Sequence, residues 1–297
     1  MRTIAKFPYS GFIVVSSLLA TGLGCQSQSV SRMLSPQTED YAEARKTFKT
    51  KLLRSGPAPQ KYDPLQLPEG VDQITYSKPN HLKAWISSIP STSSKQPAVL
   101  FLHGGFAFGA DDWESTKPFR DAGFIVMTPL LRGENGQSGN YSMFYDEVTD
   151  VLSALDVLIA TPGVDKNRIF LAGHSVGGTL TMLTALTTKK LRGAASFSGS
   201  PDQISWSQGQ PEAIPFDPAS AKEFQMRSPI AYPGSFKCPT RLFYGDEEII
   251  FSNVTEKLAV LAKGKRLDVE AVKVAGNHFD ALPEEIRESI DFFKSLN

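Results

Sequence analysis

The stretch from Ile169 to Thr179 carries the residue with the clearest chemistry in the chain. Four apolar residues typical of a buried strand run into Gly173-His174-Ser175-Val176-Gly177, and helix-forming residues follow without a break. A Gly-x-Ser-x-Gly turn between a strand and a helix strains the serine backbone and holds its hydroxyl clear of the sheet, where it can attack a carbonyl carbon. Ser175 is therefore the candidate nucleophile. The alternative is a glycine-rich turn whose serine has no role.

A serine hydroxyl is unreactive near neutral pH, so the site also needs a base and a carboxylate that orients the base. His278, in the turn Gly276-Asn277-His278 after the last predicted strand, is the candidate base. A lone histidine is more often structural, but this place, about one helix from the chain end, favours catalysis. Three consecutive acids, Asp246, Glu247 and Glu248, follow another strand and offer the carboxylate.

A glycine-rich loop, 103–109, follows the first fully apolar strand. It reads His-Gly-Gly-Phe-Ala-Phe-Gly, and its glycines leave backbone N–H groups open to a substrate oxygen. Attack on a carbonyl carbon places negative charge on that oxygen, and fixed N–H dipoles stabilise it. The predicted oxyanion hole consists of the amides of Gly105 and Phe106 with that of Val176. The alternative is a loop kept for tight packing, and His103 is expected to be a buried residue that holds it.

Strands alternate with helices along most of the chain. This order predicts an α/β fold with a mostly parallel central sheet, an antiparallel N-terminal hairpin and helices on both faces. Ligands of such sheets bind beyond the carboxyl ends of the strands, which is where Ser175, Glu248 and His278 are expected. Residues 200–235 lack a clear period and are predicted to form a cap or lid. The predicted strands are 71–76, 81–89, 98–102, 124–128, 169–172, 194–197, 240–244 and 267–274, and the predicted helices are 38–53, 111–122, 141–159, 179–186, 253–263 and 283–296.

Charge and cysteine content exclude several classes of function. Lys plus Arg and Asp plus Glu each total 31, so the balance gives no sign of nucleic-acid binding, and small neutral or apolar substrates fit better. The two cysteines, Cys25 and Cys238, form neither a redox motif nor a spaced ligand set, so no metal is predicted. Nothing in the sequence specifies an oligomeric state.

Residues 1–24 are predicted to be a signal peptide. Arg2 and Lys6 precede the fourteen-residue run from Gly11 to Gly24, which is shorter than the ~18 residues of a membrane span and fits the ~7 to 15 residue core of a secretory signal. Thr21-Gly22-Leu23-Gly24-Cys25 resembles the bacterial lipobox, although Gly22 stands where leucine is usual. Cys25 is thus the predicted lipid attachment site and the only predicted route to a membrane.

The predicted location follows from this signal: the bacterial cell envelope if the chain is lipid-anchored, or otherwise the periplasm or the medium. The alternatives are a cleaved signal without lipid and an uncleaved anchor. Residues 25–60 are predicted to form a tether and an N-terminal helix, and residues 61–297 a catalytic domain that includes the cap.

Five segments match one known superfamily: Leu102-His103-Gly104-Gly105, Leu131-Arg132-Gly133 with Gly136, Gly173 to Gly178, Gly245 with its acids, and Gly276-Asn277-His278-Phe279. They resemble the α/β-hydrolases, in which the chain order is also nucleophile, acid, histidine. Within that superfamily they resemble the catalytic domains of prolyl oligopeptidase-like and dienelactone hydrolase-like enzymes, over residues 98–296. The resemblance implies a serine hydrolase that needs no metal or organic cofactor. Arg132 is expected either to line the acyl pocket or to brace its turn.

The same resemblance ranks the three acids. Related hydrolases most often place the acid three residues after a glycine at this strand end, ahead of a short apolar pair, and this aligns Glu248 with the role. Those families usually have aspartate there, so Asp246 is the alternative. Glu247 is expected to be solvated.

The expected function is that of an exported serine hydrolase that forms an acyl-enzyme on a small ester or a short peptide. Esters are favoured because long prolyl oligopeptidases carry an N-terminal β-propeller, and the stretch before His103 is too short for one. The alternatives are a prolyl oligopeptidase-like serine peptidase and a catalytically silent hydrolase fold used as a binding lipoprotein.

Overall fold

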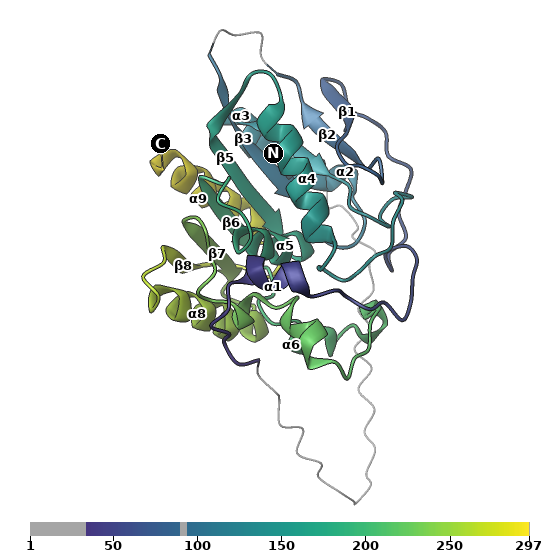
Figure 1. The fold of residues 1–297 in the computed structure, drawn as a ribbon. Coiled ribbons are helices and arrows are strands. Elements are labelled where there is room, and N and C mark those ends of the chain that lie inside the picture. The colour runs from purple at the N-terminus through teal and green to yellow at the C-terminus, as the bar shows by residue number, and fades with distance from the viewer. Residues whose placement is uncertain (1–33, 90–93, 297) are drawn as a thin grey trace, which may run out of the picture. The chain divides into compact units, whose positions relative to one another are not determined.

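A computed structural model describes residues 34–89 and 94–296 (Figure 1). The predicted signal peptide, 1–24, and Cys25 lie outside the described residues. No helix in the described ranges is long and apolar enough to cross a membrane.

A single eight-stranded sheet forms the centre of the described chain, with the order β1-β2-β4-β3-β5-β6-β7-β8. β2 pairs antiparallel with β1 and β4, and all pairs from β4 to β8 are parallel. The predicted parallel sheet with an antiparallel hairpin is therefore confirmed. The strands are β1 (Val71–Thr75), β2 (Lys83–Ser87), β3 (Gln96–Leu102), β4 (Ile125–Pro129), β5 (Val164–His174), β6 (Gly193–Phe197), β7 (Thr240–Gly245) and β8 (Val269–Val274).

Helices cover both faces of the sheet. Those of one face, with α4 lying across the sheet in Figure 1, are α1 (Tyr41–Thr47), α4 (Glu147–Ala160), α5 (Val176–Ala185) and α8 (Ile249–Lys263). Those of the other are α2 (Ala110–Ser115), α3 (Lys117–Asp121) and α9 (Leu282–Ser295). Because strand side chains alternate, Leu100 and Leu102 of β3 join the first core while Val99 and Phe101 join the second.

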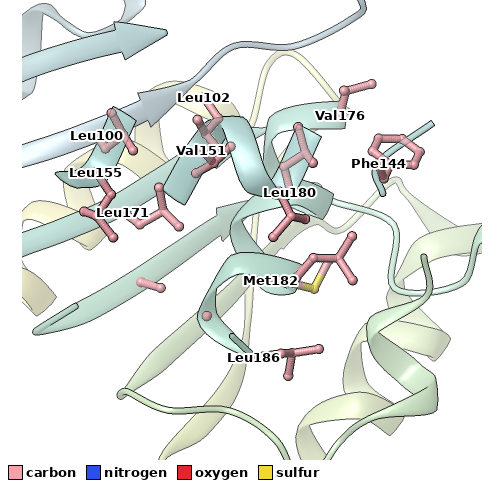
Figure 2. Close-up of a cluster of buried hydrophobic side chains, with 14 of the residues drawn as sticks. Leu100, Leu102, Phe144, Val151, Leu155, Leu171, Val176, Leu180, Met182 and Leu186 are labelled. Atoms are coloured by element: carbon pink, nitrogen blue, oxygen red, sulfur yellow. The ribbon is translucent and has the colours of Figure 1, made fainter. Parts of the chain in front are cut away.

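The first core fixes the helix that follows Ser175. Leu100 and Leu171 from the sheet, Val151 and Leu155 from α4, and Leu180 from α5 gather in one cluster, shown in Figure 2. All are at most 1% exposed, and burying such a side chain stabilises the fold by about 1.5–3 kcal/mol. The start of α5 is therefore held rigidly against the sheet.

The second core anchors α9. The ring of Phe293 stacks on that of Phe170 in β5, with ring centroids 4.5 Å apart, and also contacts Phe119 and Phe124. Phe293 is fully buried. The last helix is thus attached to the back of the strand that carries the Gly-x-Ser-x-Gly turn.

The predicted N-terminal helix, 38–53, is shorter in the structure, because α1 ends at Thr47. The carboxylate of Glu223 accepts hydrogen bonds from the Lys51 N–H and the Thr50 hydroxyl, each over 2.8 Å. Leu52 then forms an antiparallel bridge with Phe216. These contacts with a distant segment satisfy the backbone outside a helix, and so they override the helical pattern.

Two other helices differ from their predicted bounds. The predicted helix 111–122 is divided into α2 and α3, and Pro118 at the start of α3 has no N–H with which to continue the preceding turn. The helix predicted from Tyr141 begins at Glu147. Glu147 accepts hydrogen bonds from the N–H and the hydroxyl of Ser142, both over 2.6 Å, so the residues before it form a loop.

The predicted cap, 200–235, consists of short helical turns: α6 (Gln203–Ser207), η1 (Pro211–Ala213), α7 (Ala221–Gln225) and η2 (Pro229–Ala231). Its apolar side chains, including Phe216 and Met226, belong to the first core. Tyr41 of α1 ties the N-terminal helix to this segment, because its hydroxyl donates to the Met226 carbonyl over 2.8 Å and its N–H to Ser235 Oγ over 3.0 Å.

Candidate active site

The turn at Ser175 has the geometry expected of a nucleophile elbow. Ser175 has a φ of 54° and a ψ of −112°, a region that costs a non-glycine residue free energy. Its N–H donates to the Phe197 carbonyl of β6 over 2.8 Å, which holds the strained backbone in place. A Cβ at Gly173 would lie 2.5 Å from the Gly177 carbonyl oxygen, and one at Gly177 would collide with Leu102, so both positions require glycine.

His278 and Glu248 are in direct contact. Glu248 Oε1 lies 2.6 Å from His278 Nδ1, and the turn after β8 and the end of β7 bring the two together. The neighbouring acids are placed differently. Asp246 accepts a hydrogen bond from the Gly276 N–H over 2.9 Å and so ties the two loops together, while the Glu247 side chain is exposed.

Three donors hold the Glu248 carboxylate. Oε2 accepts from the Ser198 hydroxyl over 2.5 Å and from the Gly245 N–H over 2.8 Å, while Oε1 faces His278. Burial raises the pKa of this carboxyl, but the hydrogen bonds from His278, Ser198 and Gly245 outweigh burial and lower the pKa below its usual value. Glu248 is therefore ionised near neutral pH and can stabilise a positive charge on the imidazole.

His174, the residue before Ser175, contacts the backbone and the ring of His278. Its Nε2 lies 2.9 Å from the His278 carbonyl oxygen, and the two rings are 4.8 Å apart. Burial and the neighbouring His278 lower the pKa of His174 to about 4. His174 is therefore a neutral donor that fixes the backbone at His278.

The three amides predicted to bind an oxyanion lie in different surroundings. Val176 is the first residue of α5, so its N–H has no acceptor within the helix. Gly105 has a φ of 66°, which glycine adopts without strain. The Phe106 N–H donates to the side-chain oxygen of Gln60 over 2.7 Å, so this donor is engaged by a residue of the N-terminal segment.

A buried ion pair and an aspartate shape the loop 103–109. His103 Nε2 lies 3.0 Å from Glu134 Oε2 and its Nδ1 lies 3.0 Å from the Gly104 carbonyl. Burial lowers the pKa of His103, but the Glu134 carboxylate outweighs it and the pKa rises to about 9. Asp112 accepts from the Gly109 N–H over 2.8 Å. His103 is therefore protonated near neutral pH, and it links Glu134 to the backbone of the loop.

Arg132 braces its own turn. Its Nε and Nη2 each donate to the Asp150 carboxylate over 2.7 Å, and its backbone N–H donates to the same carboxylate over 3.1 Å. Of the two roles expected from the sequence, the geometry favours the structural one.

An aromatic cluster lies beside the loop. Phe106 contacts Tyr141, Phe144 and Trp206, with ring centroids 5.1, 6.1 and 5.9 Å away. Trp206 belongs to the cap and Phe144 to the loop before α4. Phe106, Tyr141 and Phe144 are at most 7% exposed, so the cluster is part of the core next to the predicted oxyanion hole.

Three residues near the site were not anticipated from the sequence: Gln60, Ser198 and Glu285. Ser198 follows β6 and so shares the sheet edge with Ser175, which is a signal that could have identified it. Glu285 lies on the buried stripe of α9 with Ile286, Ser289, Ile290 and Phe293, and an acid at such a position is the only sequence signal. Within the described ranges, no group of three or more His, Cys, Asp or Glu side chains could hold a metal ion.

A family model and a known relative both match this chain. The model of the "Alpha/beta hydrolase family" matches residues 99–285. The uncharacterized peptidase YtmA of Bacillus subtilis (strain 168) is 28% identical over 178 residues, 54% of this chain and 66% of that protein. The chain therefore spans about two thirds of that relative.

Solved structures agree in fold. A puromycin-hydrolyzing peptidase of Mycobacterium tuberculosis superposes with a TM-score of 0.65 at 18% identity, over 76% of this chain and 39% of that one. Thermogutta terrifontis esterase 2 superposes with a TM-score of 0.63 at 19% identity, over 80% of this chain and 98% of that one.

Proposed function

The chain belongs to the α/β-hydrolase family, and we propose that it is a serine hydrolase with Ser175 as nucleophile, His278 as general base and Glu248 as the acid that orients His278. The observation that carries the proposal is the 2.6 Å contact between Glu248 Oε1 and His278 Nδ1, on the sheet edge where the strained turn presents Ser175. Asp246, the alternative acid, is engaged by the Gly276 N–H.

In the proposed reaction, His278 Nε2 accepts the proton of Ser175 as Oγ attacks the substrate carbonyl carbon. The imidazolium is stabilised by the ionised Glu248 at Nδ1, and it then returns the proton to the leaving group. Water attacks the resulting acyl-enzyme by the same route, which releases the acid and restores Ser175. The N–H groups of Val176 and Gly105 stabilise the oxyanion, and that of Phe106 can join them when Gln60 moves aside.

We favour esters of apolar acids as substrates. The cluster of Phe106, Tyr141, Phe144 and Trp206 supports this choice, because it places apolar rings beside the predicted oxyanion hole. The match to 98% of a solved esterase points the same way. The second candidate is a peptidase acting on short peptides, which the relative named as a peptidase favours.

A fluorophosphonate probe tests the proposal, because it reacts with a serine only where a base and an oxyanion hole activate the hydroxyl. We expect the wild-type protein to be labelled and Ser175→Ala to be neither labelled nor active, with an unchanged circular dichroism spectrum. Undiminished turnover by Ser175→Ala would end the proposal. A folded but unlabelled wild-type protein would favour the silent binding lipoprotein.

Substrate class is decided by rates on matched compounds. Acyl esters of graded chain length and short peptide amides with the same acyl part separate the two candidates through their kcat/KM values. An ester is intrinsically more reactive than the amide with the same acyl part, so measurable turnover of the amides would favour the peptidase, and turnover of the esters alone would favour the esterase.

A further inference from the structure

α9 carries a carboxyl group that the proposed reaction does not use. Glu285 is fully buried, although the rest of the buried stripe of this helix is apolar or hydroxylic. Its Oε1 lies 3.2 Å from Ser198 Oγ, and its Oε2 has no hydrogen-bond partner among the described residues. A buried carboxylate in such surroundings would carry a large desolvation penalty.

Ser198 lies between two carboxyl groups. Its hydroxyl is 2.5 Å from Glu248 Oε2 and 3.2 Å from Glu285 Oε1. A hydroxyl has one proton to donate, and the short distance assigns it to the ionised Glu248. The contact with Glu285 is then favourable only if Glu285 carries a proton and donates it to Ser198 Oγ. Ser198 itself is held at a φ of 48°, so the hydroxyl is fixed by a strained backbone.

The electrostatic surroundings agree with a protonated Glu285. Burial, the larger cause, and the negative charge of Glu248 raise the pKa of Glu285 to about 8. The ionisable groups that face it are Glu248 and, beyond Glu248, His278. The other charged side chains on α3, β7 and α9 are engaged elsewhere or exposed. The ion pairs are those of Lys117 with Asp121, Arg120 with Glu114, Arg241 with Asp268 and Glu270, and Arg287 with Glu284, Glu288 and Asp291, while Lys294 is exposed.

We propose that Glu285 is a positioning residue of the active site, which in its protonated form donates to Ser198 and so holds the Ser198 hydroxyl on the Glu248 carboxylate that faces His278. The inference rests on the proposed serine hydrolase function. Loss of the Glu285 proton would place a second negative charge beside Glu248 and would make the two carboxylates compete for one hydroxyl proton. Ser198 would then hold Glu248 less firmly, and the orientation of His278 would be lost at alkaline pH.

The test compares Glu285→Gln, whose carboxamide N–H can donate to Ser198 at every pH, with Glu285→Leu, which has no donor. kcat and KM are measured on a p-nitrophenyl ester between about pH 6 and pH 10. The wild-type kcat/KM is expected to fall through an alkaline limb near pH 8, in line with the Glu285 pKa of about 8. The limb should be absent from Glu285→Gln.

At pH 7 the two variants should differ in kcat and share the wild-type KM. The two variants differ in the hydrogen bond donated to Ser198. We therefore expect kcat to fall about twofold in Glu285→Gln and about tenfold in Glu285→Leu. Asp291→Asn is the matched control, because this acid lies on the same helix with its side chain 71% exposed. It should keep the wild-type profile.

Two kinetic outcomes would overturn the inference: an unchanged alkaline limb in Glu285→Gln, or equal kcat values for the Gln and Leu variants. Infrared spectroscopy gives a readout that does not depend on activity. Burial also raises the pKa of Glu147 to about 7, so its protonated form contributes the same band in both proteins. The carbonyl stretch of a protonated Glu285 should therefore be present in the difference spectrum of wild type minus Glu285→Gln at pH 7. If the fluorophosphonate fails to label Ser175, the proposed function fails, and absence of this band would separately refute the protonated Glu285.

Discussion

His174 and His278 are linked through the backbone, because His174 Nε2 donates a hydrogen bond to the His278 carbonyl oxygen over 2.9 Å. A carbonyl oxygen only accepts, so the proton of the neutral His174 ring is on Nε2. The residue before the candidate nucleophile thereby sets the position of the candidate base.

The burial of His174 predicts a pH-dependent contribution to stability, because burial and the neighbouring His278 lower the pKa of His174 although this hydrogen bond raises it. A histidine of the unfolded chain takes up a proton near pH 6.5, whereas the pKa of about 4 keeps folded His174 neutral until far lower pH. The free energy of unfolding should therefore fall as the pH drops from about 6.5 to about 4, with a contribution on the order of 3 kcal/mol. Urea unfolding of wild type and His174→Phe at several pH values measures it. If the free energy of unfolding changes equally with pH in the two proteins, the low pKa of folded His174 is contradicted.

The choice of acid predicts a strong difference between two conservative variants. Glu248→Gln removes the charge that faces Nδ1 of His278, so kcat should fall by orders of magnitude, on the order of 10⁴, with little change in KM. Asp246→Asn should have a mild effect, because the carboxamide oxygen can still accept from the Gly276 N–H. Steady-state kinetics of both variants decide the matter, and the reverse ranking would transfer the role to Asp246.

Gln60 predicts a variant that gains activity. A substrate oxygen that uses the Phe106 N–H must displace the Gln60 side chain, which is bound over 2.7 Å. Gln60→Ala should therefore raise kcat/KM about two- to tenfold, the range expected for one net hydrogen bond. Gln73→Ala on the exposed face of β1 serves as control. A lower kcat/KM in Gln60→Ala would instead mean that Gln60 supports the loop.

Export through Cys25 remains a proposal from the sequence. In a bacterial host, globomycin should cause a longer precursor to accumulate, and Cys25→Ala should prevent attachment of the lipid. Mass spectrometry and membrane fractionation distinguish these forms. Protein that accumulates in the cytoplasm with Met1 intact would contradict the predicted export.

The strand ends and their turns could be predicted from the sequence because local requirements specify them. Gly173 and Gly177 leave space that no side chain can fill, so the turn around Ser175 is visible as a pattern. Glu248 and His278 follow strands of a parallel sheet, and the topology brings such positions to one edge. Their distance from each other, in contrast, depends on the loops.

Contacts between segments far apart in the sequence determine the features that could not be predicted from it, which are the end of α1 and the residues that surround the candidate site. α1 ends early because Glu223, more than 170 residues away, binds the backbone that follows it. Gln60 reaches the loop 103–109 through tertiary packing alone. Ser198 and Glu285 each resemble ordinary polar residues in an apolar surrounding, and only the folded chain places both beside Glu248.

Two attachments of α9 lie at different places: Phe293 stacks on Phe170 behind the sheet, and Glu285 touches Ser198 at the edge that carries the candidate site. Partial detachment of this helix would break the second attachment while leaving β5 and α5 paired with their other neighbours. Local opening of a terminal helix requires less free energy than global unfolding. Low denaturant concentrations should therefore inactivate the protein before its secondary structure is lost, which makes turnover a sensitive reporter of helix docking.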